Sequence, residues 1–174
     1  MDQSEAKENP GFLEYVYKLN DGIELEQALE LSLKEINDID IAQFNRIGLQ
    51  SYAEGKWSIH KIIQHLIDWE RIWCFRAVIF ARGEGTTPVG HDQEIMGIHS
   101  NADGLSIEQL VNELRIVRQS SIALFESFDT SILETTCRFF EYEMPLSAIG
   151  LTITAHQIHH FKIIEERYLT LDNK

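Results

Sequence analysis

The sequence has few of the residues that interrupt helices or cross-link a chain. Proline occurs three times and cysteine twice among 174 residues. Because proline ends or kinks a helix, its scarcity leaves room for long helices. The two cysteines, Cys74 and Cys137, cannot build the disulfide framework of a small secreted protein. We therefore expect a helical protein of the reducing cytoplasm.

Positive charge is also scarce. Fifteen Lys and Arg residues oppose 28 Asp and Glu residues, which gives a net charge of −13. Nucleic acids and anionic membranes both attract basic surfaces, so this balance argues against either partner. No apolar run is long enough to cross a bilayer, and residues 1–10 are polar and acidic, without the apolar core of a signal peptide.

Apolar residues recur at helical spacing in four long segments. The segments are residues 23–36, 58–82, 106–128 and 145–168. Ser58 and Ser106 are placed to cap the second and third segments, and Pro145 fits the first turn of the fourth. No segment shows the convincing alternation of apolar and polar residues that is typical of a β-strand. We therefore predict an all-α four-helix bundle that forms a single domain over residues 1–174, with residues 1–9 frayed.

The connections between these segments differ in length. Gly83 to Leu105 is a long loop with the reach to join two parallel helices, and loops of this length are often functional. A short helix is expected around residues 42–52, and residues 133–143 form a further connection. The candidate buried residues of that short helix are Phe44, Ile47 and Leu49.

Three of the seven histidines lie within residues 155–161, in an otherwise apolar segment. His156 and His160 are one turn apart on the face that carries the buried isoleucines, so both should point into the protein. A buried imidazole needs a partner for its nitrogens. Two explanations fit equally well at this point, a hydrogen-bonded pair of core histidines or two ligands of one metal ion.

A third histidine would favour the metal site. His65 lies at the edge of the apolar face of the second helix, and a bundle brings inward residues of separate helices together. Three imidazoles leave one coordination position open, as in catalytic metal sites. The other histidines are poorer candidates because of their positions: His60, His91, His99 and His159.

Two motifs resemble the DinB-like family, specifically its YfiT-like branch. The first is Gly55-Lys56-Trp57-Ser58 followed by Gln64 to Arg71, and the second runs from Ala155-His156-Gln157-Ile158-His159-His160 to Glu166-Arg167-Tyr168-Leu169. Their order and spacing agree with the family over nearly the whole chain. The sequence departs from the family pattern at His91 and at Ala155, and neither change touches a ligand position.

The resemblance implies a bundle of up-down-down-up topology and a metal triad at His65, His156 and His160. Family members bind nickel, zinc or other divalent ions such as manganese or iron, and many are homodimers. Some relatives are S-transferases or isomerases that use low-molecular-weight thiols, and others are classed as metal-dependent hydrolases. We therefore expect a divalent metal cofactor, a small-molecule substrate and a homodimer.

Three functions remain open on this basis. A divalent ion on three imidazoles can lower the pKa of a bound water to roughly 7, which suits hydrolysis, or it can hold a thiol as thiolate for transfer. The third possibility is a non-catalytic stress-response module, which would have the same four-helix bundle but would catalyse no reaction. For hydrolysis, Asp92 in the long loop is the candidate general base, although a turn residue is the alternative explanation. Asp68 could orient His65 through a hydrogen bond.

Overall fold

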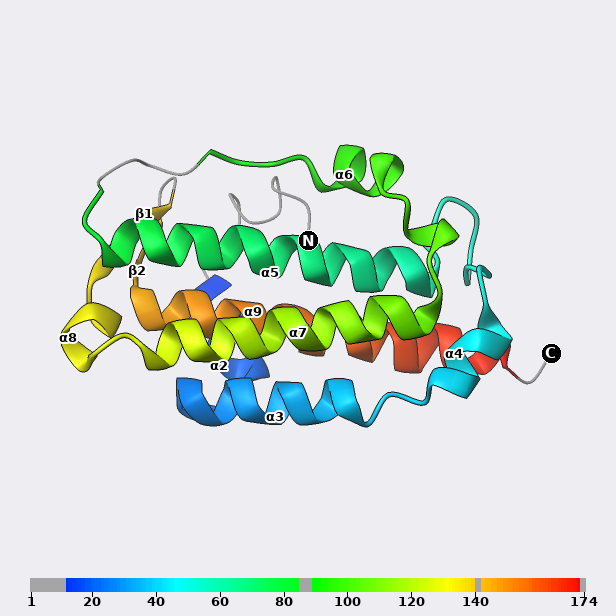
Figure 1. The fold of residues 1–174 in the computed structure, drawn as a ribbon, viewed down its shortest axis with the longest axis horizontal. Coiled ribbons are helices and arrows are strands. Elements are labelled where there is room, and N and C mark those ends of the chain that lie inside the picture. Colours follow the sequence, from blue (N-terminus) through cyan, green and yellow to red (C-terminus); the bar gives the residue numbers. More distant parts are fainter. Residues whose placement is uncertain (1–11, 85–88, 140–141, 173–174) are drawn as a thin grey trace.

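Four long helices form the bundle in the computed structural model, which describes residues 12–84, 89–139 and 142–172. They are α3 (Leu25–Asn37), α5 (Ile59–Ala81), α7 (Ile107–Glu126) and α9 (Leu146–Ile163). In Figure 1, α5 and α7 run in one direction while α3 and α9 run in the other. The prediction of an up-down-down-up four-helix bundle is therefore confirmed.

The expected start signals of the central helices are confirmed. Ser58 precedes α5, and its hydroxyl accepts a hydrogen bond from the amide of Lys61. Ser106 precedes α7 and exchanges two hydrogen bonds with Gln109 in a capping box. Each bond satisfies an amide that the first helical turn leaves free, which fixes where the helix begins.

The last helix is surrounded by other elements. α9 packs against α5, α3 and the short helix α2 (Phe12–Leu19). Its residues from Ala148 to Ala155 are all buried, so no side of this half faces water. Asn20 fastens α2 to α9, because its amide donates to the carbonyls of Val16 and Leu151 over 2.8 and 2.9 Å. Beyond Ile163 the chain continues in a π-helical turn, Ile164–Tyr168.

The crossover from α5 to α7 contains a helix that the sequence analysis missed. α6 (Gln93–His99) lies along α5 and is followed by a 3₁₀ turn, Ala102–Gly104 (Figure 1). Asp103 in that turn accepts a hydrogen bond from Ser58 and pairs with Lys61. The crossover is thus fixed to the beginning of α5, which holds α6 over this helix.

The expected connection at residues 133–143 also proved to be partly regular. It follows the short helix α8 (Thr130–Leu133) and contains the antiparallel strands β1 (Thr136–Phe139) and β2 (Tyr142–Pro145). Cys137 pairs with Met144 and both side chains are buried. Four residues per strand give too short an alternation to be detected in a single sequence. Pro145 ends β2, so α9 begins one residue later than expected.

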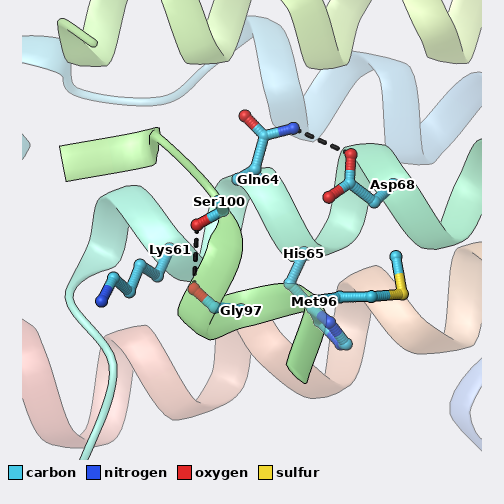
Figure 2. A pocket seen from close by; sticks show the side chains of 7 residues that line it. All are labelled: Lys61, Gln64, His65, Asp68, Met96, Gly97 and Ser100. Carbon is cyan, nitrogen blue, oxygen red and sulfur yellow. Dashed lines mark hydrogen bonds between the residues drawn. The ribbon is translucent and has the colours of Figure 1, made fainter. Parts of the chain in front are cut away.

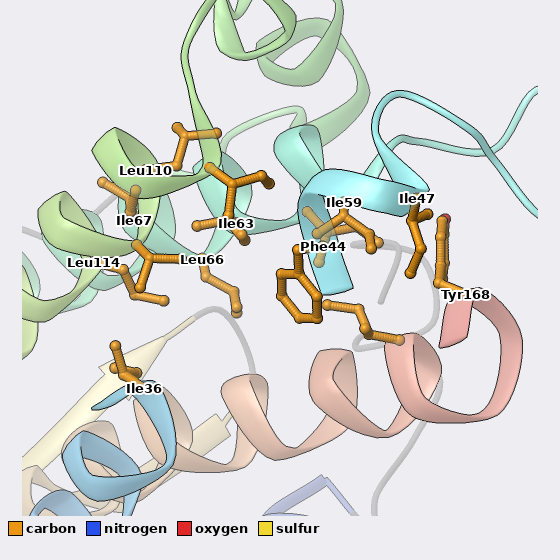
Figure 3. Packing of buried hydrophobic residues seen from close by; sticks show 14 of the residues in the cluster. Ile36, Phe44, Ile47, Ile59, Ile63, Leu66, Ile67, Leu110, Leu114 and Tyr168 are labelled. Carbon is orange, nitrogen blue, oxygen red and sulfur yellow. The ribbon is translucent and has the colours of Figure 1, made fainter. Parts of the chain in front are cut away.

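The core at one end of the bundle joins all four long helices through apolar side chains, many of them shown in Figure 3. The short helix α4 (Ile41–Ile47) covers this end with Phe44 and Ile47, both buried as expected. Leu49, expected to be buried, is instead 56% exposed because α4 ends at Ile47. Within the described part of the chain, no helix is long and apolar enough to span a membrane.

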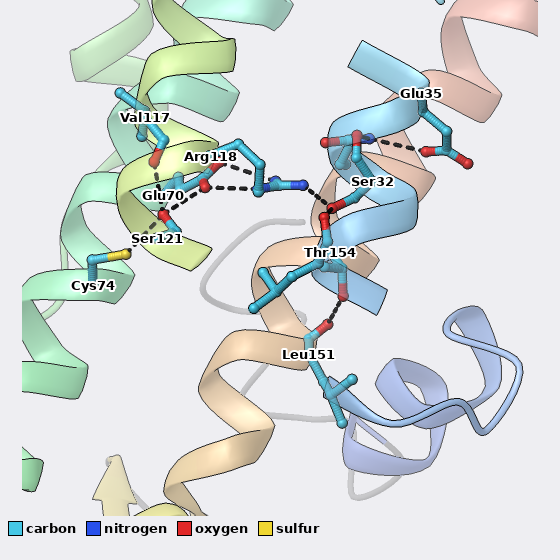
Figure 4. A network of polar contacts seen from close by, with 11 residues as sticks. Ser32, Glu35, Glu70, Cys74, Val117, Arg118, Ser121, Leu151 and Thr154 are labelled. Atoms are coloured by element: carbon cyan, nitrogen blue, oxygen red, sulfur yellow. Dashed lines mark hydrogen bonds and ion pairs between the residues drawn. The ribbon is translucent and has the colours of Figure 1, made fainter. Parts of the chain in front are cut away.

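A polar network crosses the middle of the bundle. Glu70 of α5 and Arg118 of α7 form a buried ion pair, and Arg118 also donates to the hydroxyl of Ser32 on α3 (Figure 4). Ser121 donates to Glu70 and lies 3.1 Å from the sulfur of Cys74. Burial raises the pKa of the Cys74 thiol to about 11, which makes this cysteine unreactive at neutral pH.

Candidate metal centre

Three imidazoles from two helices meet inside the bundle. His65 comes from α5, and His156 and His160 come from α9. The Nε2 atom of His156 lies 2.9 Å from Nε2 of His65 and 3.0 Å from Nε2 of His160. One nitrogen of each ring lies within 4.8 Å of the others. The predicted set is therefore brought together, and it is a set of donors that could hold a metal ion.

The helix geometry explains why these rings meet. His156 and His160 are four residues apart, so they lie on the same face of α9 and one turn from each other. α9 packs against α5, and His65 lies on the side of α5 that faces it. The ring centroid of His65 lies 4.7 Å from that of His156 and 4.9 Å from that of His160.

The surroundings keep the three rings neutral. His65 and His160 are 6% and 8% exposed, and His156 is partly buried. Burial lowers the pKa of His65 to about 3 and lowers the pKa values of His156 and His160 well below their ordinary value. The neighbouring imidazoles add to the effect, because two positive charges at this distance would repel. A neutral imidazole has the free lone pair that a metal ion needs.

Aromatic rings fix the orientation of His65. The ring of Trp57 lies 5.0 Å from it and the ring of Trp69 lies 6.1 Å from it, measured between centroids. Trp57 also packs closely against α6, because a Cβ atom added to Gly97 would come within 2.8 Å of the indole. Tyr168 also donates to the carbonyl of Trp57 over 2.6 Å. Helix α6 thus supports a ring that packs on His65 of the histidine cluster.

A small pocket lies beside His65, between α5 and α6. Its lining residues, drawn in Figure 2, are Lys61, Gln64, His65, Asp68, Met96, Gly97 and Ser100. Asp68 accepts a hydrogen bond from the amide of Gln64 over 2.9 Å, and burial raises the pKa of its carboxyl. Among the hydrogen bonds of the described residues, none joins Asp68 to His65, although both face the same pocket.

Asp92, the candidate base, lies outside the histidine cluster. It is exposed and caps α6, since its carboxylate accepts from the amides of Glu94 and Ile95 over 2.9 and 3.1 Å. The structure therefore shows that Asp92 has a local structural role, because its carboxylate caps the first turn of α6. Its part in chemistry stays a prediction.

The remaining histidines lie around the cluster or away from it. His159 is next to His160, with ring centroids 5.1 Å apart, and His91 lies 6.4 Å from Trp69. His60 is buried near the start of α5, and His99 is exposed at the end of α6. None of these four joins the metal-ligating group found among the described residues.

The sequence analysis missed most residues that surround the cluster. In the sequence, Trp57 stands out only as part of the first motif, and nothing marks the pocket residues on α6. Trp57 directly precedes the cap of α5, which was a local signal for a packing role. The α6 residues had no such signal, because their position depends on the path that the crossover takes across α5.

Comparisons with known proteins agree with this picture of the fold. The sequence pattern of the DinB superfamily matches residues 24–164. No curated protein matches the chain. Among solved structures, the chain is similar to YfiT from Bacillus subtilis, described as a probable metal-dependent hydrolase with an unusual four-helix bundle topology. The TM-score is 0.61 at 14% identity, with 91% of this chain and 89% of that chain covered.

Proposed function

The chain belongs to the DinB superfamily, and we propose that it is a metal-dependent hydrolase acting on a small molecule. The observation that carries the proposal is the convergence of His65, His156 and His160, with one ring nitrogen of each within 4.8 Å of the others. The description of YfiT as a probable metal-dependent hydrolase supports the same reaction class.

The donor set fits a divalent ion. Imidazole nitrogen suits zinc and nickel better than magnesium or calcium, which prefer oxygen ligands; manganese and iron are weaker candidates. Three protein ligands leave at least one position open to a substrate or water. When bound, such an ion would supply Lewis-acid activation of water at neutral pH.

The residues of the chain would contribute position and environment. His65, His156 and His160 would hold the ion as neutral donors, because burial keeps their pKa values low. Trp57 and Trp69 would keep water away from the flanks of His65 and limit its rotation. A low-dielectric, fixed environment strengthens the electrostatic effect of a bound cation on a substrate.

Metal content tests the site. Protein purified without chelator is expected to carry about one divalent ion per chain, measured by mass spectrometry of the metals. His65→Ala, His156→Ala and His160→Ala should each lose most of it. His159→Ala is the matched control, since His159 neighbours a ligand on the same helix but lies outside the cluster. Equal metal in the control and in the three variants would refute the assignment.

Turnover tests the reaction class. Metal-loaded protein should hydrolyse some ester or amide in a substrate panel, and His160→Ala should abolish that turnover. Rate enhancement only in the presence of a low-molecular-weight thiol would select the S-transferase function instead. Failure with every ester, amide and thiol conjugate, in protein that holds its metal, would favour a non-catalytic binding module. The expectations of a homodimer and a cytoplasmic location stay predictions.

A further inference from the structure

The pocket between α5 and α6 is the size of one water molecule. Its cavity volume is about 10 Å³, close to the least space in which a protein holds an ordered water. The side chains of Gln64, Asp68 and Ser100 bring amide, carboxylate and hydroxyl groups to its lining (Figure 2). Since a buried water needs about two to four polar partners, this pocket is suited to a single bound water.

His65 lines the same pocket and has a ring nitrogen that the cluster does not use. Its Nε2 atom lies 2.9 Å from Nε2 of His156, so Nε2 is the atom that would bind an ion. A neutral imidazole with a lone pair on Nε2 carries its proton on Nδ1. No hydrogen bond between the residues that the structure describes reaches Nδ1 of His65. Metal-binding histidines almost always donate this second N–H group to a carboxylate, a carbonyl or a water.

Asp68 offers an acceptor at the pocket. It follows His65 by three residues on α5, so the two side chains are neighbours on the helix surface. One carboxylate oxygen accepts from the amide of Gln64 over 2.9 Å, and in Figure 2 the other oxygen is turned away from Gln64. Burial raises the pKa of this carboxyl, because the charged form has lost more hydration than its hydrogen bond replaces. A further donor would therefore stabilise the carboxylate.

The other polar side chains of the pocket fit this role less well. Ser100 donates its hydroxyl to the carbonyl of Gly97 over 3.0 Å. Lys61 carries only donors, and its Nζ atom pairs with Asp103 over 3.3 Å. Of the seven residues that line the pocket, Asp68 is the one carboxylate. It is thus the strongest acceptor that a water beside His65 can reach.

We propose that one water molecule in this pocket joins the Nδ1–H group of His65 to the carboxylate of Asp68, and that Asp68 thereby positions His65 for metal binding. The water accepts a hydrogen bond from Nδ1–H and donates one to Asp68. This bridge keeps the proton on Nδ1, leaves the lone pair of Nε2 to the cluster and makes the ring a stronger donor. The role of the bridge rests on the proposed function, since it serves a metal ion.

Zinc affinity tests the role of Asp68. Competition with a chelating indicator measures the zinc dissociation constants of the wild-type protein, Asp68→Ala and Glu113→Ala. Glu113 is the matched control, because its carboxylate lies near enough to influence the pKa of Asp68 and pairs with Arg71 of α5, but does not line the pocket. Asp68→Ala should weaken zinc binding about 10–100-fold, whereas Glu113→Ala should bind zinc like the wild-type protein. An unchanged affinity in Asp68→Ala, or an equal loss in both variants, would overturn the positioning role.

The place of the proton on His65 gives a second measurement, which needs no metal. Long-range ¹⁵N–¹H correlation spectra of labelled, metal-free protein distinguish a proton on Nδ1 from one on Nε2, and the signals missing from His65→Gln identify His65. The wild-type ring should carry its proton on Nδ1. Asp68→Ala should lower the share of this form, because the hydrogen bond of one nitrogen decides which nitrogen is protonated. Glu113→Ala should match the wild-type protein.

A proton on Nε2 in the wild-type protein, or the same share of the Nδ1 form in Asp68→Ala, would contradict the bridge. The two measurements also separate failure of the bridge from failure of the metal site. A protein that binds no zinc but loses the Nδ1 form in Asp68→Ala would have the bridge without the metal. Zinc bound equally well by the wild-type protein and Asp68→Ala would leave the metal site and refute the role of Asp68.

Discussion

Glu70 and Arg118 form an ion pair whose two side chains are 2% and 1% exposed. Two hydrogen bonds of 2.8 and 3.0 Å join the guanidinium to the two carboxylate oxygens. The pair links α5 to α7, the two helices that run parallel and are connected only by the long crossover. It thus fixes the register of α5, which carries His65, against the rest of the bundle.

Removing one partner of this pair should strongly destabilise the protein. Glu70→Gln leaves the buried charge of Arg118 without its counter-ion, a loss of about 3–5 kcal/mol of unfolding free energy. The matched control is Glu113→Gln, which breaks the exposed pair of Arg71 and Glu113 between the same helices and should cost at most about 1 kcal/mol. Urea denaturation measures both, and equal losses would contradict the importance of burial.

Metal binding should stabilise the folded state. Free zinc at one hundred times its dissociation constant adds about 2.7 kcal/mol to the free energy of unfolding. For a chain of this size, that gain raises the melting temperature by roughly 5–10 °C. His159→Ala should show the same rise, while His156→Ala should show none. The measurement is thermal unfolding in zinc and in chelator. A rise of the same size in His156→Ala would place the ion elsewhere.

The metal-free protein should lose stability as the pH falls from 7 to 5. The pKa of His65 is about 3 in the folded protein and about 6.5 when unfolded. Below pH 6.5 the unfolded chain therefore binds a proton that the folded chain does not, which favours unfolding. This one group accounts for about 2 kcal/mol at pH 5.

Denaturation with urea at pH 7, 6 and 5 checks this dependence. His65→Gln, which cannot titrate, should lose less stability over the interval than the wild-type protein. The expectation fails if the two proteins show the same dependence on pH, because His65 would then be protonated equally in both states.

Adding a methyl group at Gly97 should disturb the support of His65. The new Cβ would lie 2.8 Å from the Trp57 indole, and overpacking of this kind costs about 1–3 kcal/mol. Since Trp57 packs on His65, zinc affinity should fall as well. Gly104→Ala is the control, because nothing lies within 4 Å of its added Cβ. Unchanged zinc affinity in Gly97→Ala would show that α6 and the metal site are independent.

Two substitutions separate the roles of Asp92. Asparagine caps helices as well as aspartate does, so Asp92→Asn should keep stability, while Asp92→Ala should lose about 1 kcal/mol with the cap of α6. If the carboxylate also acts as the general base, Asp92→Asn lowers turnover roughly 100-fold or more. Full turnover in this variant would leave Asp92 with the capping role alone.

The sequence by itself determined the long helices and the three histidines. Helical spacing of apolar residues and the caps at Ser58 and Ser106 are local signals, so they can be read without knowing the partners. His156 and His160 share a face because four residues make about one turn. His65 followed from the requirement that inward faces of a bundle meet, and the structure brings the three rings together.

Only the tertiary structure decided what surrounds the histidines. α6 is seven residues long, too short for periodicity to reveal, and its place over Trp57 depends on the path of the crossover. Asp92 was predicted as the candidate base from its place in the long loop, whereas in the structure its carboxylate caps α6 by accepting from the amide of Glu94. The structure also shows that the buried Nε1 atom of Trp69 has no hydrogen-bond partner among the described residues, which depends on neighbours from distant parts of the chain and so could not be predicted from the sequence.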